Sequence, residues 1–227
     1  MYLIYLLNKT YEINKGILHE QKKTVYFTQV NNGTTEDYNL LNQYATEYAK
    51  GTASNILNAM IELDNGLSEY QVSRLDHSLM SATRAWFDGA DIDWIVSALL
   101  HDIGDMFAPY NHDEYAATII KSFVREQFRW VLEKHGDFQF VYYAHHIQEA
   151  DLRKRDRYKG NKFFGNCVIF CEWSDQANFD PHYKNLSIDF FAPMVHEVFA
   201  RKPFNKDIVN ANPNPLVNRE ITIKRRG

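Results

Sequence analysis

The feature that most constrains the fold of this chain is a nearly continuous apolar stretch, Ile92–Leu100, that ends directly in His-Asp-Ile-Gly. Asp91 has a side chain preferred at a helix N-cap, and the residues after it are too apolar for a helix at the surface. We therefore expect a central buried helix that delivers His101 and Asp102 to the interior. Because unpaired charge is costly there, these two side chains either form a hydrogen-bonded pair or bind a metal ion.

Amphipathic helical patterns lie on both sides of this stretch. From Tyr38 to Tyr48, apolar or aromatic residues recur at steps of three and four, as on one face of a helix. Further helices are predicted at about residues 56–63, 71–87, 112–125, 127–148, 162–178 and 187–201. The sequence therefore predicts an all-α domain of six to eight helices.

The chain divides by pattern into three parts. Residues 1–36 are polar and contain the loop signal Asn-Asn-Gly-Thr-Thr, so we expect an N-terminal extension, with at most a short strand. Residues 37–203 are the predicted helical domain, and 204–227, punctuated by Asn and Pro, are expected to be a surface strand or arm. A length of 227 residues suits one domain, or two at most.

Charge and hydropathy exclude several classes of partner. The net charge is −4 and the isoelectric point about 6.1, which argues against a nucleic-acid binder, because such a protein needs a basic face. The apolar run Tyr2–Leu7 is shorter than a signal-peptide core or a membrane span. We therefore expect a cytoplasmic protein with a small-molecule partner and no membrane partner.

Histidine is the unusual residue type, with nine in the chain and six of them from His77 to His146. Five successive predicted helices supply polar side chains that can bind metal: His77, His101, Asp102, His112, His135 and Asp175. Each alone is more often a capping, hydrogen-bonded or solvated residue, but donors from facing helices are how metal sites in helical bundles are built. Four His and two Asp suffice for two six-coordinate ions once solvent or substrate completes the shells.

The order His…His-Asp…His…His…Asp resembles the HD-domain superfamily of metal-dependent enzymes, over about residues 66–200. Within its two-metal branch, the chain is similar to the mixed-valent diiron oxygenases, the group of inositol oxygenase and the organophosphonate-cleaving HD oxygenases. Residues 111–115, Asn-His-Asp-Glu-Tyr, are similar to a segment of inositol oxygenase, and 134–136, Lys-His-Gly, match more loosely. Residues 175–181 resemble a motif of bacterial HD proteins described as predicted phosphohydrolases.

The resemblance implies an HD-domain helical bundle with a dinuclear metal site between its helices. Asp102 would bridge the two ions as the catalytic residue. His77, His101 and Asp175 would hold one iron, and His112 with His135 would hold the other, which would keep positions open for substrate and O2. The cofactors implied are two iron ions in the Fe(II)/Fe(III) state, with O2 as co-substrate, although manganese also suits these ligands.

The substrate-binding parts of the family do not carry over. The lysine that contacts inositol is Asp105 here, the tyrosine and glutamate of the phosphonate enzyme have no match in residues 66–70, and its lysine near the fourth histidine is Gln139. Inositol is therefore not the expected substrate. Arg74 can pair with an anionic substrate, and the remaining candidates for contact are Gln139, Tyr142, His145 and His146. The alternative is that these residues lie at the surface or orient the ligands.

Three functions fit this set of residues. The first is an oxygenase that cleaves a C–C or C–P bond next to a hydroxyl-bearing carbon of a small polar substrate. The second is a metal-dependent phosphohydrolase acting on a nucleotide or another phosphoester, for which a basic cleft would help. Only Lys121 and Lys134 are lysines between residues 77 and 146, which favours the first. A metal-free binding module is disfavoured because good ligands occupy all six positions.

Overall fold

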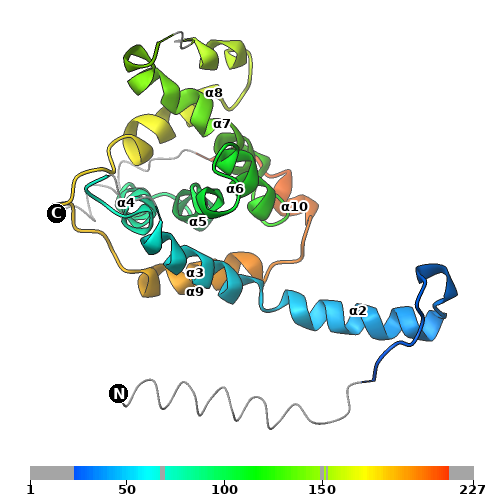
Figure 1. The fold of residues 1–227 in the computed structure, drawn as a ribbon. Helices are drawn as coiled ribbons and strands as arrows, with labels where there is room; N and C mark the ends of the chain where they lie inside the picture. Colours follow the sequence, from blue (N-terminus) through cyan, green and yellow to red (C-terminus); the bar gives the residue numbers. More distant parts are fainter. Residues whose placement is uncertain (1–22, 67–69, 149–150, 152, 215–227) are drawn as a thin grey trace, which may run out of the picture. The chain divides into compact units, whose positions relative to one another are not determined.

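The computed structural model describes residues 23–66, 70–148, 151 and 153–214, and these are helical, with no strand among them (Figure 1). The all-α prediction is confirmed. The chain divides into two compact units, Met1–Lys50 and Gly51–Gly227. In the described part, no helix combines the length and the apolar character that a membrane span needs.

In the described part of the first unit, residues 23–50, the long helix is α2 (Thr35–Ala49). Thr34 and Asp37 form a capping box at its N-terminus, in which each side chain bonds the backbone of the other. None of the residues of α2 is buried, so the helix contributes nothing to the core of its unit. The boundary between the two units follows Lys50, just after the C-terminal end of α2. The sequence pattern instead predicts a domain that starts at residue 37.

The core of the second unit is built around α5 (Ile92–Leu100), in which every residue from Asp93 to Leu100 is buried. Asp91 accepts a hydrogen bond from the backbone of Trp94 and caps the helix, as predicted. Two pairs of helices pack closely here: α4 (Arg74–Phe87) with α5, and α6 (His112–Ile120) with α7 (Glu126–Tyr143). The buried central helix of the sequence prediction is therefore confirmed.

The remaining helices complete this unit. α3 (Thr52–Glu62) and α9 (Ile188–Phe199) lie along one another and cover the α4–α5 side of the core (Figure 1). α8 (Phe164–Phe170) packs on α7 and continues into a π-helical turn, Cys171–Asp175.

Several predicted elements differ from the observed ones. The helix predicted over residues 112–125 ends at Ile120. The helix predicted to run to residue 148 ends at Tyr143 and is followed by a 3-10 turn, Ala144–His146. The predicted tail, expected as a strand or arm, contains the short helix α10 (Lys206–Val209), which begins where the Asn205 side chain accepts from the backbone of Asp207. Residues 215–227 of that tail, and the residues Tyr2–Leu7, lie outside the described part.

Candidate metal centre

The six predicted ligands come together in the second unit. His101 and Asp102 follow the last turn of α5, His77 lies in the first turn of α4, and His135 lies in the middle of α7. His112 is the first residue of α6, and Asp175 is the last residue of the π-helical turn. All of these side chains are buried except that of His112, which is 27% exposed. Five segments thus converge on one point in the interior.

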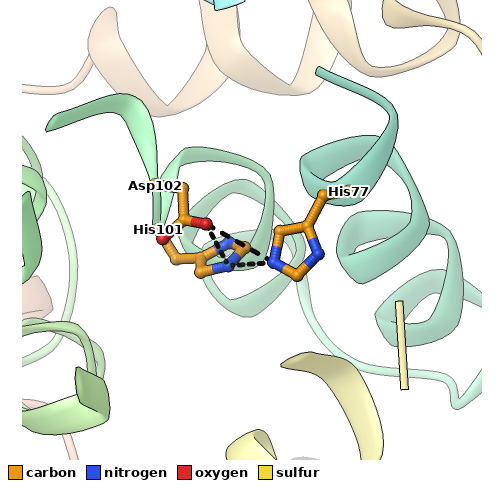
Figure 2. A group of neighbouring side chains, drawn as sticks. All are labelled: His77, His101 and Asp102. Carbon is orange, nitrogen blue, oxygen red and sulfur yellow. Dashed lines mark hydrogen bonds and ion pairs between the residues drawn. The ribbon is translucent and has the colours of Figure 1, made fainter. Parts of the chain in front are cut away.

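Two histidines face one oxygen of Asp102. The Nε2 atoms of His77 and His101 lie 3.1 Å apart, and each is 3.4 Å from Oδ2 of Asp102 (Figure 2). Oδ1 of Asp175 lies 3.3 Å from Nε2 of His77 and 3.7 Å from Nε2 of His101. His77 and His101 therefore direct their Nε2 atoms toward carboxylate oxygens of both Asp102 and Asp175.

The other oxygen of Asp102 faces a second pair of histidines. Oδ1 lies 3.5 Å from Nε2 of His112 and 3.5 Å from Nε2 of His135. Ligand atoms within metal-binding reach of one another therefore form one group on each side of this carboxylate, and a third group of His101, His135 and Asp175 links the two. A carboxylate placed between two groups of nitrogen ligands is the arrangement that a bridging role requires.

The hydrogen bonds of the buried histidines determine which ring nitrogen holds the proton when the ring is neutral. Nδ1 of His77 lies 3.1 Å from the carbonyl oxygen of Asn178, Nδ1 of His101 is 2.8 Å from that of Ala98, and Nδ1 of His135 is 2.7 Å from that of Leu132. A carbonyl only accepts, so in each neutral ring Nδ1 holds the proton and Nε2 presents a lone pair. Two lone pairs 3.1 Å apart repel unless a cation lies beside them or one ring gains a proton.

The carboxylates of Asp102 and Asp175 are also stabilised by nearby positive charge. Burial opposes ionisation of Asp102, but the charge of His101 and the hydrogen bond of His135 outweigh it, and the pKa of Asp102 lies well below its usual value. The pKa of Asp175 is also lowered, against burial, by its hydrogen bonds with His101 and His77. Oδ2 of Asp175 is buried and has no hydrogen-bond partner among the described residues. This orphaned oxygen fits a metal ligand.

Without metal, protons on the histidines supply the positive charge. Burial lowers the pKa of His135, but its hydrogen bond with Asp102 and the negative charges of Asp175 and Asp102 outweigh burial and raise that pKa to about 10. The pKa of His77 is raised, against burial, by Asp175 and Asp102 in the same way. The residue types, the Nε2 atoms that face the cluster and the orphaned oxygen therefore fit a divalent metal site, in which a bound ion would displace these protons.

His112 has a different outer partner from the other three histidines. Its Nδ1 lies 3.4 Å from Oδ1 of Asp105, a carboxylate instead of a backbone carbonyl. Oδ2 of Asp105 is ion-paired with Nε of Arg74 at 2.8 Å, and Nη1 of Arg74 donates to Oδ2 of Asp102 at 3.4 Å. A carboxylate behind a ligating imidazole orients it and increases its basicity. The sequence gives no local signal for this role, because Asp105 is notable there only as the residue that stands where the family has a lysine.

The polar face of α4 is covered by the segment that carries Asp175. Nε of Arg84 donates to Oδ1 of Asn178 at 2.7 Å, and the amide of Asn178 donates to Ser81 at 2.6 Å. Ser81 in turn donates to the backbone of Ser174. Periodicity would place His77, Ser81 and Arg84 on an exposed face. They are instead held against residues 174–178, which explains why His77 is buried.

A cavity of about 130 Å³ reaches the cluster, and two of the predicted substrate-contacting residues line it, Arg74 and Gln139. Gln139 donates to Oδ1 of Asp175 at 2.9 Å, so it also holds a predicted ligand in place. Tyr143 lines the cavity in the position that we expected for Tyr142, whose side chain packs against the core.

The structure does not bring His145 and His146 to this cavity. Both are exposed on the 3-10 turn after α7, and their ring centroids lie 3.9 Å apart. The predicted helix would have continued through them and placed His146 one turn from Tyr142. Because α7 ends at Tyr143, that relation is lost.

No protein-family model and no curated protein matches the chain. The resemblance to the HD superfamily therefore stays a prediction from the sequence. What the geometry supplies by itself is a buried group of four histidines and two aspartates, arranged on both sides of one carboxylate and reached by a small cavity.

Proposed function

We propose that the chain holds two metal ions, an iron pair, and uses O2 to cleave a C–C or C–P bond next to a hydroxyl-bearing carbon of a small polar substrate. The proposal rests on the position of the Asp102 carboxylate between two pairs of histidines. Its Oδ2 faces His77 and His101, while its Oδ1 faces His112 and His135. A single ion would use only one of these two groups.

The residues have distinct roles in this proposal. His77, His101 and Asp175 would hold one ion, His112 and His135 the other, and Asp102 both. A bound iron pair would supply redox chemistry with O2, which amino-acid side chains lack. The ion beside His112 would have fewer protein ligands than the other, and His112 is the ligand that is partly exposed, so this side leaves room for substrate.

The chain's own residues prepare the cavity for a small substrate. Arg74 and Gln139 offer hydrogen-bond donors at its wall, and Arg74 can bind a carboxylate or phosphonate group. The ring of Phe179 lies 4.7 Å from that of His77, and the ring of Phe170 lies 5.4 Å from that of His101, measured between centroids. These rings keep water from the inner side of the cluster.

The charge of the cavity favours oxidation over phosphoester hydrolysis. Arg74 is the one lysine or arginine among the described residues that line it, and its guanidinium is already paired with Asp105 and close to Asp102. A phosphoester carries one or two negative charges, and apart from Arg74 only the metal ions would neutralise them. Phosphohydrolase activity stays the alternative, with Arg74 as the observation in its favour.

The test loads the protein with iron under anaerobic conditions and measures iron content, low-temperature EPR after partial reduction, and O2 uptake with hydroxylated acids and phosphonates. We expect close to two irons per chain, the signal of a coupled Fe(II)/Fe(III) pair, and O2 uptake with at least one compound. Two ions without that signal, together with hydrolysis of phosphoesters, would favour the alternative.

Matched histidine variants provide the control for this test. His112→Ala should lose one ion and all O2 uptake, because His112 is a ligand of only one group. His196→Ala should retain both ions, because His196 is an exposed residue of α9 that takes no part in the cluster. If the two variants lost metal equally, the assignment of His112 would be wrong.

A further inference from the structure

A second cavity, of about 310 Å³, lies beside the metal-site cavity and shares two side chains with it. Arg74 and His112 line both. The rest of the second cavity is lined by Leu63, Gly66, Asp105, Met106 and Pro109. We call it the tail cavity. A ligand that extends from the metal cluster past Arg74 and His112 would enter it.

The wall of the tail cavity is apolar except where it meets the metal site. Leu63 is fully buried at the end of α3, while Met106 is 40% exposed and Pro109 is also at the surface, so the cavity is open on the side of these two residues. At the other end, the polar groups of Arg74 and Asp105 already pair with each other, and Asp105 also pairs with His112. The tail cavity therefore suits an apolar group, because its wall offers no polar side chain beyond those at the junction with the metal site.

The metal-site cavity is too small for a whole substrate of ordinary size. A cavity of about 150 Å³ holds a single benzene ring, so 130 Å³ holds a head group of a few atoms. A larger substrate must extend into a neighbouring space. The tail cavity has about twice the volume of the benzene site and a size typical of small-molecule pockets.

We propose that the tail cavity binds the apolar part of the substrate, and that this substrate is a medium-chain hydroxy acid, with a hydroxyl-bearing carbon and an acid group at the metals and a tail of about six carbons. The inference rests on the proposed function, because it takes the metal cluster as the site of the head group. Arg74, at the junction of the two cavities, binds the acid group, and Met106 and Pro109 contact the tail. Chain length then determines specificity.

The experiment measures binding of a series of 2-hydroxy acids, from 2-hydroxypropanoate to 2-hydroxyoctanoate, to the two-metal protein by isothermal titration calorimetry under anaerobic conditions. We expect affinity to rise about fourfold with each added methylene until the cavity is filled. Met106→Asp places a charge in the wall of the tail cavity and should abolish this rise.

Tyr110→Asp is the matched control. Tyr110 is fully exposed, next to Pro109 in sequence, and does not line the tail cavity, so the same charge added there should leave the rise with chain length unchanged. Thermal unfolding of both variants shows whether either substitution affects folding.

Failure of the inference and failure of the proposed function give different results. An affinity that does not depend on chain length, a rise that Met106→Asp retains, or no binding of any acid to the two-metal protein would overturn the inference. A metal count below two per chain would instead overturn the dinuclear proposal. A rise that is equally steep in the metal-free protein would show that the tail cavity binds apolar groups independently of the cluster, which also overturns the inference.

Discussion

Replacing Gly104 by alanine tests how the second group of ligands is positioned. A Cβ atom at residue 104 would lie 2.5 Å from the carbonyl oxygen of His112 and 2.6 Å from its Cα. Both neighbours are backbone atoms at the start of α6, so neither can rotate away. An ordinary contact begins at 3.4 Å, and 3.4 − 2.5 gives a required shift of about 0.9 Å. The start of α6, with His112, must move away from Asp102.

The expected cost follows from this overlap. Overpacking of a buried contact costs about 1–3 kcal/mol, and for a chain of this size each kcal/mol lowers the melting temperature by about 2–4 °C. We therefore expect Gly104→Ala to melt about 2–12 °C below the wild type without metal. The shift also lengthens the 3.5 Å separation between His112 Nε2 and Asp102 Oδ1, so we expect loss of one of the two ions.

Thermal unfolding followed by circular dichroism, with metal analysis of the same samples, measures both effects. Gly165→Ala is the matched control, because Gly165 lies in α8, is exposed, and has no atom within 4 Å of an added Cβ. Alanine there should be neutral or stabilising by about 0.5–1 kcal/mol. If Gly104→Ala melted like the wild type and bound two ions, the close approach of Gly104 to α6 would not be what positions His112.

Three further predictions concern the surroundings of the ligands. Asp105→Asn should weaken the ion beside His112 by about 10–100-fold in a metal titration, with the other ion unaffected, because His112 is the one predicted ligand among the four histidines that Asp105 contacts. The pKa of His135 is raised to about 10, so its proton stabilises the metal-free protein fully below about pH 6.5 and less as the pH rises toward 10. Denaturant unfolding of the metal-free protein should therefore show falling stability over that pH range. Calorimetry in buffers of different ionisation enthalpy should show proton release when metal binds at about pH 7.5. Asn178→Ala should cost about 1–3 kcal/mol in chemical denaturation, because the partly buried guanidinium of Arg84 loses one of its two acceptors; an effect under about 0.5 kcal/mol would argue against that contact.

The central helix could be predicted from sequence because its determinants are local. A cap at Asp91 and an apolar run to Leu100 are sufficient to specify a buried helix and to place His101 and Asp102 at its end. The all-α fold follows from the same kind of local periodicity along the chain. The six ligand candidates could be named because buried histidine and aspartate are costly without a partner.

Other features depend on contacts between distant parts of the chain. Local periodicity gives His77 an exposed face, because the segment that covers it, which includes Asn178, lies about 100 residues further along. The end of α7 at Tyr143 likewise removed His145 and His146 from the cavity, and helix ends are poorly determined by local pattern. Asp105 lies close in sequence to Asp102, but its partner Arg74 is on another helix, so its role became visible only in three dimensions.

The two-ion centre on Asp102 is tested most directly by native mass spectrometry of the protein titrated with manganese, beside the Asp102→Asn variant. The amide that this substitution introduces would keep the shape of the side chain but lose the charge and one of the two ligand oxygens. We predict two bound ions per chain in the wild type and at most one, more weakly bound, in the variant. A wild type that binds a single ion at saturation, or a variant that binds two as tightly as the wild type, would contradict the account.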